Sequence, residues 1–445
     1  MELAPPAAKS AAIERTRARS FRLMALLTGG ALLGKLLGFV RELVMARVFG
    51  ASLTADSFRG AVTGVLLPLG PLLNEATPAI LIPMHRDWQV KRQEAVRLAA
   101  TCVALGLTAG VLMLLVQIAG PYWVSIIVGR FKPEAQKLVL DFIRIMALMM
   151  PAAVVLNCLI AAEIAEGRSR LAALRAAILN AFVTSGILLY SVTGVLSFLP
   201  WSFVLSFNAL TCWGVWIRRR EGALDWTNLR VGTVIAAWRE FMIRLRPLIA
   251  QPLVEQVHGW VERLVASGFA VGTMASLDYA RTLTDSASVL VSQPVGLAVL
   301  YKGASPRPRE QVQAIARPLL AVALPASLYL AMFSQDIVRL IFERGAFDAT
   351  AVAFTSASLR GIAFGLWAST LGMILLRLLN SSGRNVQAAL IMAVAFGANA
   401  AMSLLTARIV GLGGHGSTLL GLGEAVRGIV LLWRVSASHL TVVGL

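Results

Sequence analysis

Long apolar stretches of about 20 residues each recur along the whole chain, and they restrict its fold more than any other feature. A helix of this length crosses the hydrocarbon core of a bilayer. Of the 445 residues, 57% are hydrophobic and only 14% are charged, whereas soluble domains carry about 25% charged residues. The sequence therefore predicts an all-α, polytopic membrane protein.

Twelve membrane spans are expected, and the distribution of basic residues orients them. With the N-terminus in the cytoplasm, the cytoplasmic segments and adjoining span ends hold 26 Lys and Arg, against eight on the opposite side. Basic residues gather in the cytoplasmic loops of membrane proteins. Both ends of the chain are therefore expected in the cytoplasm. The expected spans are 21–46, 60–83, 95–119, 138–163, 171–193, 195–217, 243–271, 277–301, 312–333, 351–376, 386–407 and 417–433.

The net charge of +18 comes from 41 Lys and Arg against 23 Asp and Glu. In a membrane protein we interpret this excess as contact of basic loops with anionic lipids, not with nucleic acid. The three cysteines share no short spacing, the four histidines are scattered, and no nucleotide-binding or nucleophile motif is complete. We therefore expect no metal site and no cofactor, and a transporter instead of an enzyme.

The longest and most basic expected cytoplasmic loop divides the chain into two halves of six spans. Asn180 follows a Gly-Arg pair in the first half, and Asn399 follows another in the second. Two parallel halves with the substrate between them are a common plan of transporters. The expected parts are a basic tail (1–20), a first six-helix lobe (21–217), a basic linker (218–242) and a second six-helix lobe (243–445).

The first span combines charged residues with glycines. Lys35 and Glu42 lie seven residues apart and so share one helical face, whereas Arg41 points about 120° away on ideal helix geometry. The glycines at positions 30, 34 and 38 allow another helix to approach closely. A charge inside a span costs about 2.5–3.5 kcal/mol on insertion scales, so each needs a partner or a wet cavity.

Two later spans carry polar stripes at helical spacing. The stripe in span 243–271 consists of Gln251, Glu255, His258 and Glu262. The stripe in span 277–301 consists of Asp278, Arg281, Asp285, Ser288 and Ser292. Striped helices suit the walls of a central aqueous cavity. A network of structural salt bridges is the alternative.

Several short segments resemble one transporter family. They are residues 33–42 (LGKLLGFVRE), 46–51 (ARVFGA), 55–58 (ADSF), 279–281 (YAR) with Leu283, and 336–347 (DIVRLIFERGAF). These segments are similar to the MurJ/MviN family of lipid II flippases in the MOP exporter superfamily. The resemblance implies two six-helix lobes around a V-shaped central cavity and transport by alternating access. It also implies a glycan substrate carried on undecaprenyl diphosphate.

The resemblance also implies roles for individual residues. Lys35, Arg41 and Arg281 are similar to the cationic residues that bind the diphosphate, and Asp56 to an acidic cavity residue. Fixed positive charge suits a diphosphate in a cavity of low dielectric constant. Glu75 and Asp285 complete the expected acidic or gating residues.

Energy input must come from an ion gradient or the membrane potential, since no nucleotide motif is present. Glu255 and Glu262 are the candidates for ion coupling, because they share the polar face of one span and a cavity alters the pKa of a carboxylate. The alternative is that these acids only neutralise Arg263 and Arg281.

Two departures from the family pattern leave the substrate open. Leu69 stands where the family carries a cavity arginine, and twelve spans are expected instead of fourteen. The glycan is therefore either the lipid II precursor of peptidoglycan or a similar unit, such as an exopolysaccharide or O-antigen repeat. The sequence is also compatible with a multidrug exporter of the same superfamily, a membrane glycan polymerase, and a scaffold that binds cell-wall or polysaccharide synthases.

Overall fold

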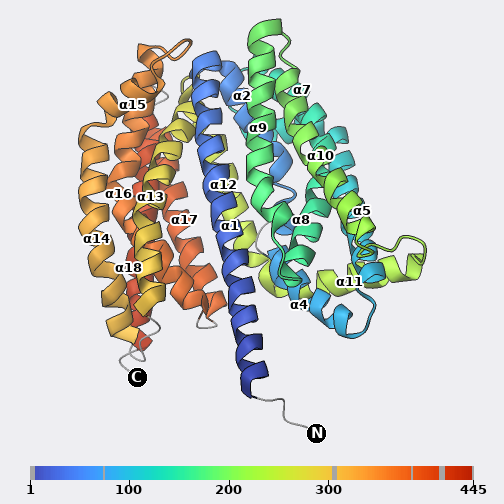
Figure 1. Ribbon diagram of the computed structural model, residues 1–445. Helices are drawn as coiled ribbons and strands as arrows, with labels where there is room; N and C mark the ends of the chain where they lie inside the picture. The colour runs from blue at the N-terminus through green and yellow to red at the C-terminus, as the bar shows by residue number, and fades with distance from the viewer. Residues whose placement is uncertain (1–5, 74–75, 303–307, 382–383, 410–415, 443–445) are drawn as a thin grey trace. The chain divides into compact units, whose positions relative to one another are not determined.

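The computed structural model describes residues 6–73, 76–302, 308–381, 384–409 and 416–442. All regular secondary structure in these ranges is helical, which confirms the all-α fold (Figure 1). Glu75, one of the expected acidic residues, lies outside the described ranges.

The chain forms two compact units. The first comprises Met1–Arg41, Pro68–Ile118 and Arg144–Ile249, and the second comprises Glu42–Leu67, Ala119–Ile143 and Ala250–Leu445. The long helix α1 (Pro6–Phe49) passes from the first unit to the second between Arg41 and Glu42. Two N-terminal segments thus pack with the C-terminal part of the chain. The division into six-helix lobes at residues 218–242 stays a prediction.

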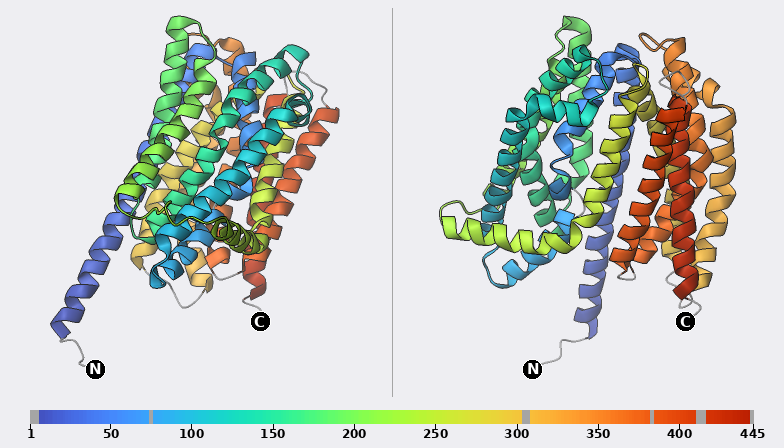
Figure 2. Two further views of the ribbon diagram at one scale, coloured as in Figure 1. Left: turned by 90° about the vertical axis from the view of Figure 1, so that its right-hand side faces the viewer. Right: turned by 180° about the vertical axis from the view of Figure 1, so that it is seen from behind.

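In the first unit, α8 packs against α4, α5 and α10, while α9 packs against α10. Helix α11 lies across the end of α5 and also contacts α4 (Figure 2). Besides most of α1, the elements are α3 (Gly70–Leu73), α4 (Ala76–Val90), α5 (Glu94–Ile118), the 3-10 turn η1 (Ala147–Met149), α8 (Met150–Ala165), α9 (Arg170–Thr193), α10 (Phe198–Arg220), α11 (Val231–Leu245) and the 3-10 turn η2 (Arg246–Leu248).

Small residues let α1 and α9 approach closely, as the glycine spacing of the first span predicts. A Cβ atom at Gly30 would lie 2.5 Å from the Cα atom of Ala173. One turn along, the amide of Asn180 donates a hydrogen bond of 2.9 Å to the carbonyl oxygen of Gly34. Only glycine leaves room for this contact, which places a polar side chain of α9 on α1.

In the second unit, α16 packs against α13, α14, α15 and α18, while α17 packs against α12 and α18 (Figure 1). Besides the end of α1, the helices are α2 (Leu53–Leu66), α6 (Gly120–Val128), α7 (Pro133–Met146), α12 (Ala250–Ala266), α13 (Thr273–Lys302), α14 (Pro308–Met332), α15 (Ser334–Phe342), α16 (Ala349–Ser381), α17 (Asn385–Ile409) and α18 (Gly416–Val442). The last three residues of α7 belong to the first unit.

Six helical segments in the described part of the chain are long and apolar enough to cross a membrane. A seventh is added if α14 and α15, which meet at a 76° bend, form one span. These segments confirm a polytopic membrane protein. Every expected span also falls on helical residues, although the second, fourth and seventh are interrupted. The count of twelve stays a prediction. Helices such as α12 and α13 carry the polar stripes, so length and apolarity alone do not identify them as spans.

Charged residues join the ends of four helices in the first unit. Both terminal nitrogens of the fully buried Arg218 donate to the carboxylate of Glu166, and the Nε2 atom of His85 lies 3.0 Å from the same carboxylate. Glu221 in turn accepts from Arg168 at 2.6 Å and from Arg170 at 2.9 Å. The network ties the ends of α8 and α10 to α4 and to the start of α9.

The close contact between α16 and α18 predicts the effect of adding one methyl group. In Gly365→Ala the new Cβ atom would lie 2.2 Å from the Cα atom of Ala425, so the helices must separate. We expect a loss of about 1–3 kcal/mol in stability. Gly397→Ala is the matched control, because a Cβ there meets no atom within 4 Å and alanine favours helix by about 1 kcal/mol. Thermal unfolding in detergent measures both, and equal unfolding temperatures would contradict the packing described.

The ion pair of Glu166 predicts a loss of stability in acid. Burial raises the pKa of Glu166, but hydrogen bonds and charges from Arg218 and His85 outweigh it and lower the pKa from 4.5 to about 2. The ionised carboxylate therefore stabilises the fold above pH 4.5, and this contribution disappears as the pH falls toward 2. After allowance for partial exposure, about 1 kcal/mol is lost between pH 7 and pH 3. Denaturation of the Glu166→Gln variant should depend less on pH over this range; an unchanged dependence would contradict the assignment.

Candidate functional site

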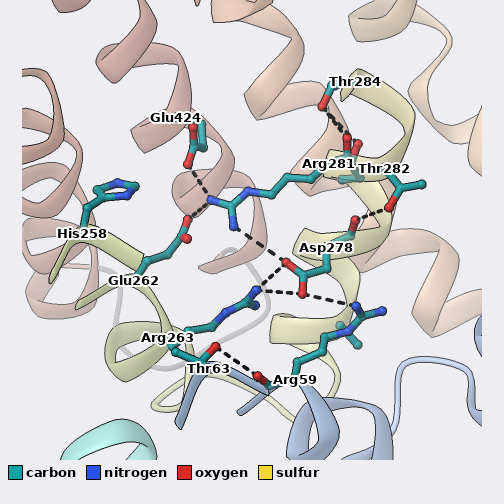
Figure 3. A network of polar contacts seen from close by, with 12 residues as sticks. Arg59, Thr63, His258, Glu262, Arg263, Asp278, Arg281, Thr282, Thr284 and Glu424 are labelled. Atoms are coloured by element: carbon teal, nitrogen blue, oxygen red, sulfur yellow. Dashed lines mark hydrogen bonds and ion pairs between the residues drawn. The ribbon is translucent and has the colours of Figure 1, made fainter. Parts of the chain in front are cut away.

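A network of ion pairs joins α1, α2, α12, α13 and α18 within the second unit, and Figure 3 shows the part of it around Asp278 and Arg281. Arg59 of α2 donates to Glu42 at 3.0 Å and to Asp278 of α13 at 3.2 Å. Arg263 of α12 donates to both oxygens of Asp278 at 2.8 Å. Two arginines from different helices therefore meet on one carboxylate.

Arg281 continues this network toward α18. Its Nη2 atom donates to Glu262 of α12 and, at 2.5 Å, to Glu424 of α18, while its Nη1 atom lies 3.7 Å from Asp278. Three carboxylates thus surround one guanidinium group, as Figure 3 shows.

Glu424 has further partners beyond Arg281. Arg427, one turn along α18, donates to its other oxygen at 2.6 Å. The amide of Asn399 on α17 lies 3.3 Å from the oxygen that Arg281 contacts, and 2.8 Å from the Nε2 atom of His258. The ring of His258 stacks on Phe396, with 4.3 Å between the ring centroids. Helices α12, α17 and α18 therefore share one polar cluster.

The described contacts of this network pair equal numbers of arginines and acids, and two of the arginines are more exposed than the acids they bond to. Four arginines, Arg59, Arg263, Arg281 and Arg427, face four acids, Glu42, Glu262, Asp278 and Glu424. The side chains of Glu262 and Glu424 are 4% and 5% exposed, whereas those of Arg281 and Arg427 are 25% and 31% exposed. At the α18 end of the network, the guanidinium groups of Arg281 and Arg427 are therefore more exposed than the carboxylates.

The two polar stripes predicted from the sequence meet here. Glu262 of the first stripe pairs with Arg281 of the second. The contacts described are those of the salt-bridge alternative, since Arg263 and Arg281 are both neutralised by acids. The aqueous cavity stays a prediction.

The other expected cationic residues lie in the first unit. Lys35 is exposed on α1, and Arg41 is partly buried and donates to the side-chain oxygen of Asn180 at 2.9 Å. Leu69, at the position of the family's cavity arginine, is fully buried. Of the predicted cationic residues, Arg281 lies in the second unit, where it pairs with other charged side chains.

The expected acidic residues have different surroundings. Asp56 is buried and accepts hydrogen bonds from the backbone N–H groups of Gly272, at 2.6 Å, and Ala275, at 2.7 Å. It therefore holds the turn that precedes α13, at a glycine with φ of +90°. Glu255 is partly buried on α12, and Asp285 is exposed on α13. Each of these two interacts with other groups.

Sequence reasoning missed three members of the network: Arg59, Glu424 and Arg427. Arg59 follows Asp56 by three residues, and Glu424 precedes Arg427 by three, so each pair lies on one helical face. Two opposite charges at this spacing were the available signal, just before an expected span for Asp56 and Arg59 and inside one for Glu424 and Arg427.

Comparison with solved structures defines the class of this fold. One match is the lipid II flippase MurJ in an inward closed conformation, with a TM-score of 0.82, 16% identity, and coverage of 93% of this chain and 87% of that one. Another is an inward-facing multidrug resistance MATE family transporter of the MOP superfamily, with a TM-score of 0.65, 13% identity, and coverage of 95% and 99%. At these identities the likeness concerns the fold, which is that of MOP superfamily transporters.

The sequence identifies the family. The profile of the family described as lipid II flippase MurJ matches residues 45–442, and the chain belongs to this family. A probable lipid II flippase MurJ of Rhizobium tropici is 25% identical over 359 residues. That match covers 76% of this chain and 66% of the relative, slightly less than two thirds of its length.

Proposed function

We propose that the protein is a flippase that moves an undecaprenyl-diphosphate-linked glycan across the bacterial cytoplasmic membrane by alternating access. Its membership of the MurJ family over residues 45–442 carries this proposal. The transporter fold and the partly exposed Arg281 support it. Guanidinium groups bind phosphate oxygens through paired N–H donors, which suits a diphosphate headgroup.

The substrate is proposed to be lipid II, with an exopolysaccharide or O-antigen repeat unit as the second candidate. Leu69 favours the second candidate, because a buried apolar side chain supplies no charge where the family carries an arginine. Both substrates share the undecaprenyl diphosphate carrier. The same headgroup site therefore serves either glycan.

Helix α11 is proposed to lie on the cytoplasmic membrane surface among anionic lipids. Val231, Ile235 and Trp238 form an exposed apolar stripe at helical spacing. The exposed Arg239 and Arg246 flank this stripe. An amphipathic helix with basic flanks binds anionic interfaces in this way. Cysteine labelling at Arg219, at the end of α10, checks the cytoplasmic orientation of the segment that leads to this helix. Interaction with glycan synthases is a separate proposal.

Transport is proposed to couple to an ion gradient through a carboxylate of α12. Glu262 already pairs with Arg281, which supports a neutralising role for it. Glu255 lies two turns earlier on the same face and is partly buried, and it is the second coupling candidate. Its carboxylate is expected to change environment as access alternates.

The coupling proposal predicts the behaviour of Glu255→Gln, which keeps the shape of the side chain and removes its titration. This variant should bind substrate normally, flip it slowly, and show no response when the gradient across proteoliposomes is collapsed. Glu134→Gln, at an exposed glutamate of α7, is the matched control. A Glu255→Gln variant that flips at the wild-type rate and still responds to the gradient would place coupling elsewhere.

The headgroup proposal predicts that Arg41→Ala and Arg281→Ala abolish flipping of lipid II or another undecaprenyl-diphosphate-linked glycan in proteoliposomes. The reason is that each change removes a fixed positive charge from the proposed diphosphate path. Arg339→Ala is the control, because Arg339 is 54% exposed and its described ion pair is a local one with Glu343. Normal flipping by both alanine variants, at normal protein level, would overturn the proposed function.

A further inference from the structure

The guanidinium group of Arg281 is already occupied by carboxylates. Glu262 and Glu424, from two different helices, both accept from its Nη2 atom, and Asp278 lies beside its Nη1 atom. Figure 3 shows the carboxylates of Glu262 and Glu424 converging on this one atom. A diphosphate that binds Arg281 must therefore compete with side chains of the protein.

Carboxylate and phosphate oxygens use the same N–H donors of a guanidinium group, so the two ligands exclude each other from one edge. A diphosphate also carries negative charge and is repelled by ionised glutamates a few ångströms away. The exposed fraction of Arg281, 25%, lets an anion reach it, while Glu262 and Glu424 are almost completely buried. Binding is thus an exchange of anions on one arginine.

The two glutamates differ in the cost of leaving Arg281. A buried carboxylate that loses its only cation is strongly destabilising. Glu424 keeps Arg427 at 2.6 Å on its second oxygen, and Asn399 lies 3.3 Å from its first. It therefore retains a charged partner and a hydrogen-bond donor when Arg281 turns away.

We propose that Glu424 is a carboxylate gate, which occupies Arg281 when no substrate is bound and is replaced there by diphosphate oxygens when the substrate enters. This inference rests on the proposed function and deepens it. Release of the substrate is the reverse exchange, in which Glu424 returns to Arg281 and displaces the diphosphate. Glu424 thereby weakens substrate binding and keeps it reversible.

The test measures binding of undecaprenyl diphosphate, and separately of inorganic pyrophosphate, to the full chain in nanodiscs. Glu424→Gln removes the competing charge and keeps the side-chain shape, so both probes should bind about tenfold more tightly. Flipping should become slower, since the substrate is released less readily. Glu343→Gln, at a glutamate just after α15 and outside this network, is the matched control and should change neither quantity.

A double variant separates Arg281 from Arg427, which also loses its partner in Glu424→Gln. The gain in affinity should vanish in Glu424→Gln combined with Arg281→Ala; a gain that persists would overturn the gate, because another cation would then hold the diphosphate. If Glu424→Gln is not monodisperse, Glu424→Asp keeps the charge but withdraws it from Arg281, and should raise affinity to a smaller degree.

The remaining outcomes separate this inference from the function on which it rests. Wild-type protein that binds the lipid, with unchanged or weaker binding in the Glu424 variants, would overturn the gate alone. Wild-type protein that binds neither probe would overturn the proposed function, and the gate with it.

Discussion

The carboxylate of Asp278 is the point on which the second unit depends. Arg59 and Arg263 bond to it, and Arg281 lies close by, so three helices meet at one negative charge. A charge inside a membrane protein is tolerated only with a partner. Arg59 also pairs with Glu42, and Arg281 with Glu262 and Glu424, so four arginines and four acids share the described network.

This balance shapes what the arginines can do. An arginine that binds a substrate must stay charged and correctly placed while no substrate is present. Acidic side chains of the protein that pair with the arginine keep it charged and hold it in place. In the proposed function, the same acids compete with the substrate for the arginines. The affinity of such a site is therefore set by a difference between two similar ion-pair interactions, a situation that suits a transporter, which must release what it binds.

Much of this arrangement follows from periodicity along single helices. The stripes that contain Glu262 and Arg281 could be predicted because residues three, four and seven apart share a helical face. The presence of Glu424 could not, because it comes from α18, more than 140 residues beyond Arg281, and tertiary packing alone decides which helices meet. Asp56 shows a different limit: the resemblance implied an acidic cavity residue, whereas the described contacts are backbone hydrogen bonds that hold the turn before α13. Its gating role stays a prediction. The two units could not be predicted either, because the sequence of an apolar span does not indicate which other span it packs against.

The passage of α1 from one unit to the other has a mechanical consequence. Arg41 donates a hydrogen bond to Asn180 in the first unit, and its neighbour Glu42 forms an ion pair with Arg59 in the second. Consecutive side chains on a helix point about 100° apart. Arg41 and Glu42 are joined by one peptide bond, and their side chains leave the helix in different directions. A single helical turn of α1, just beyond Gly38, is therefore held by side chains of both units.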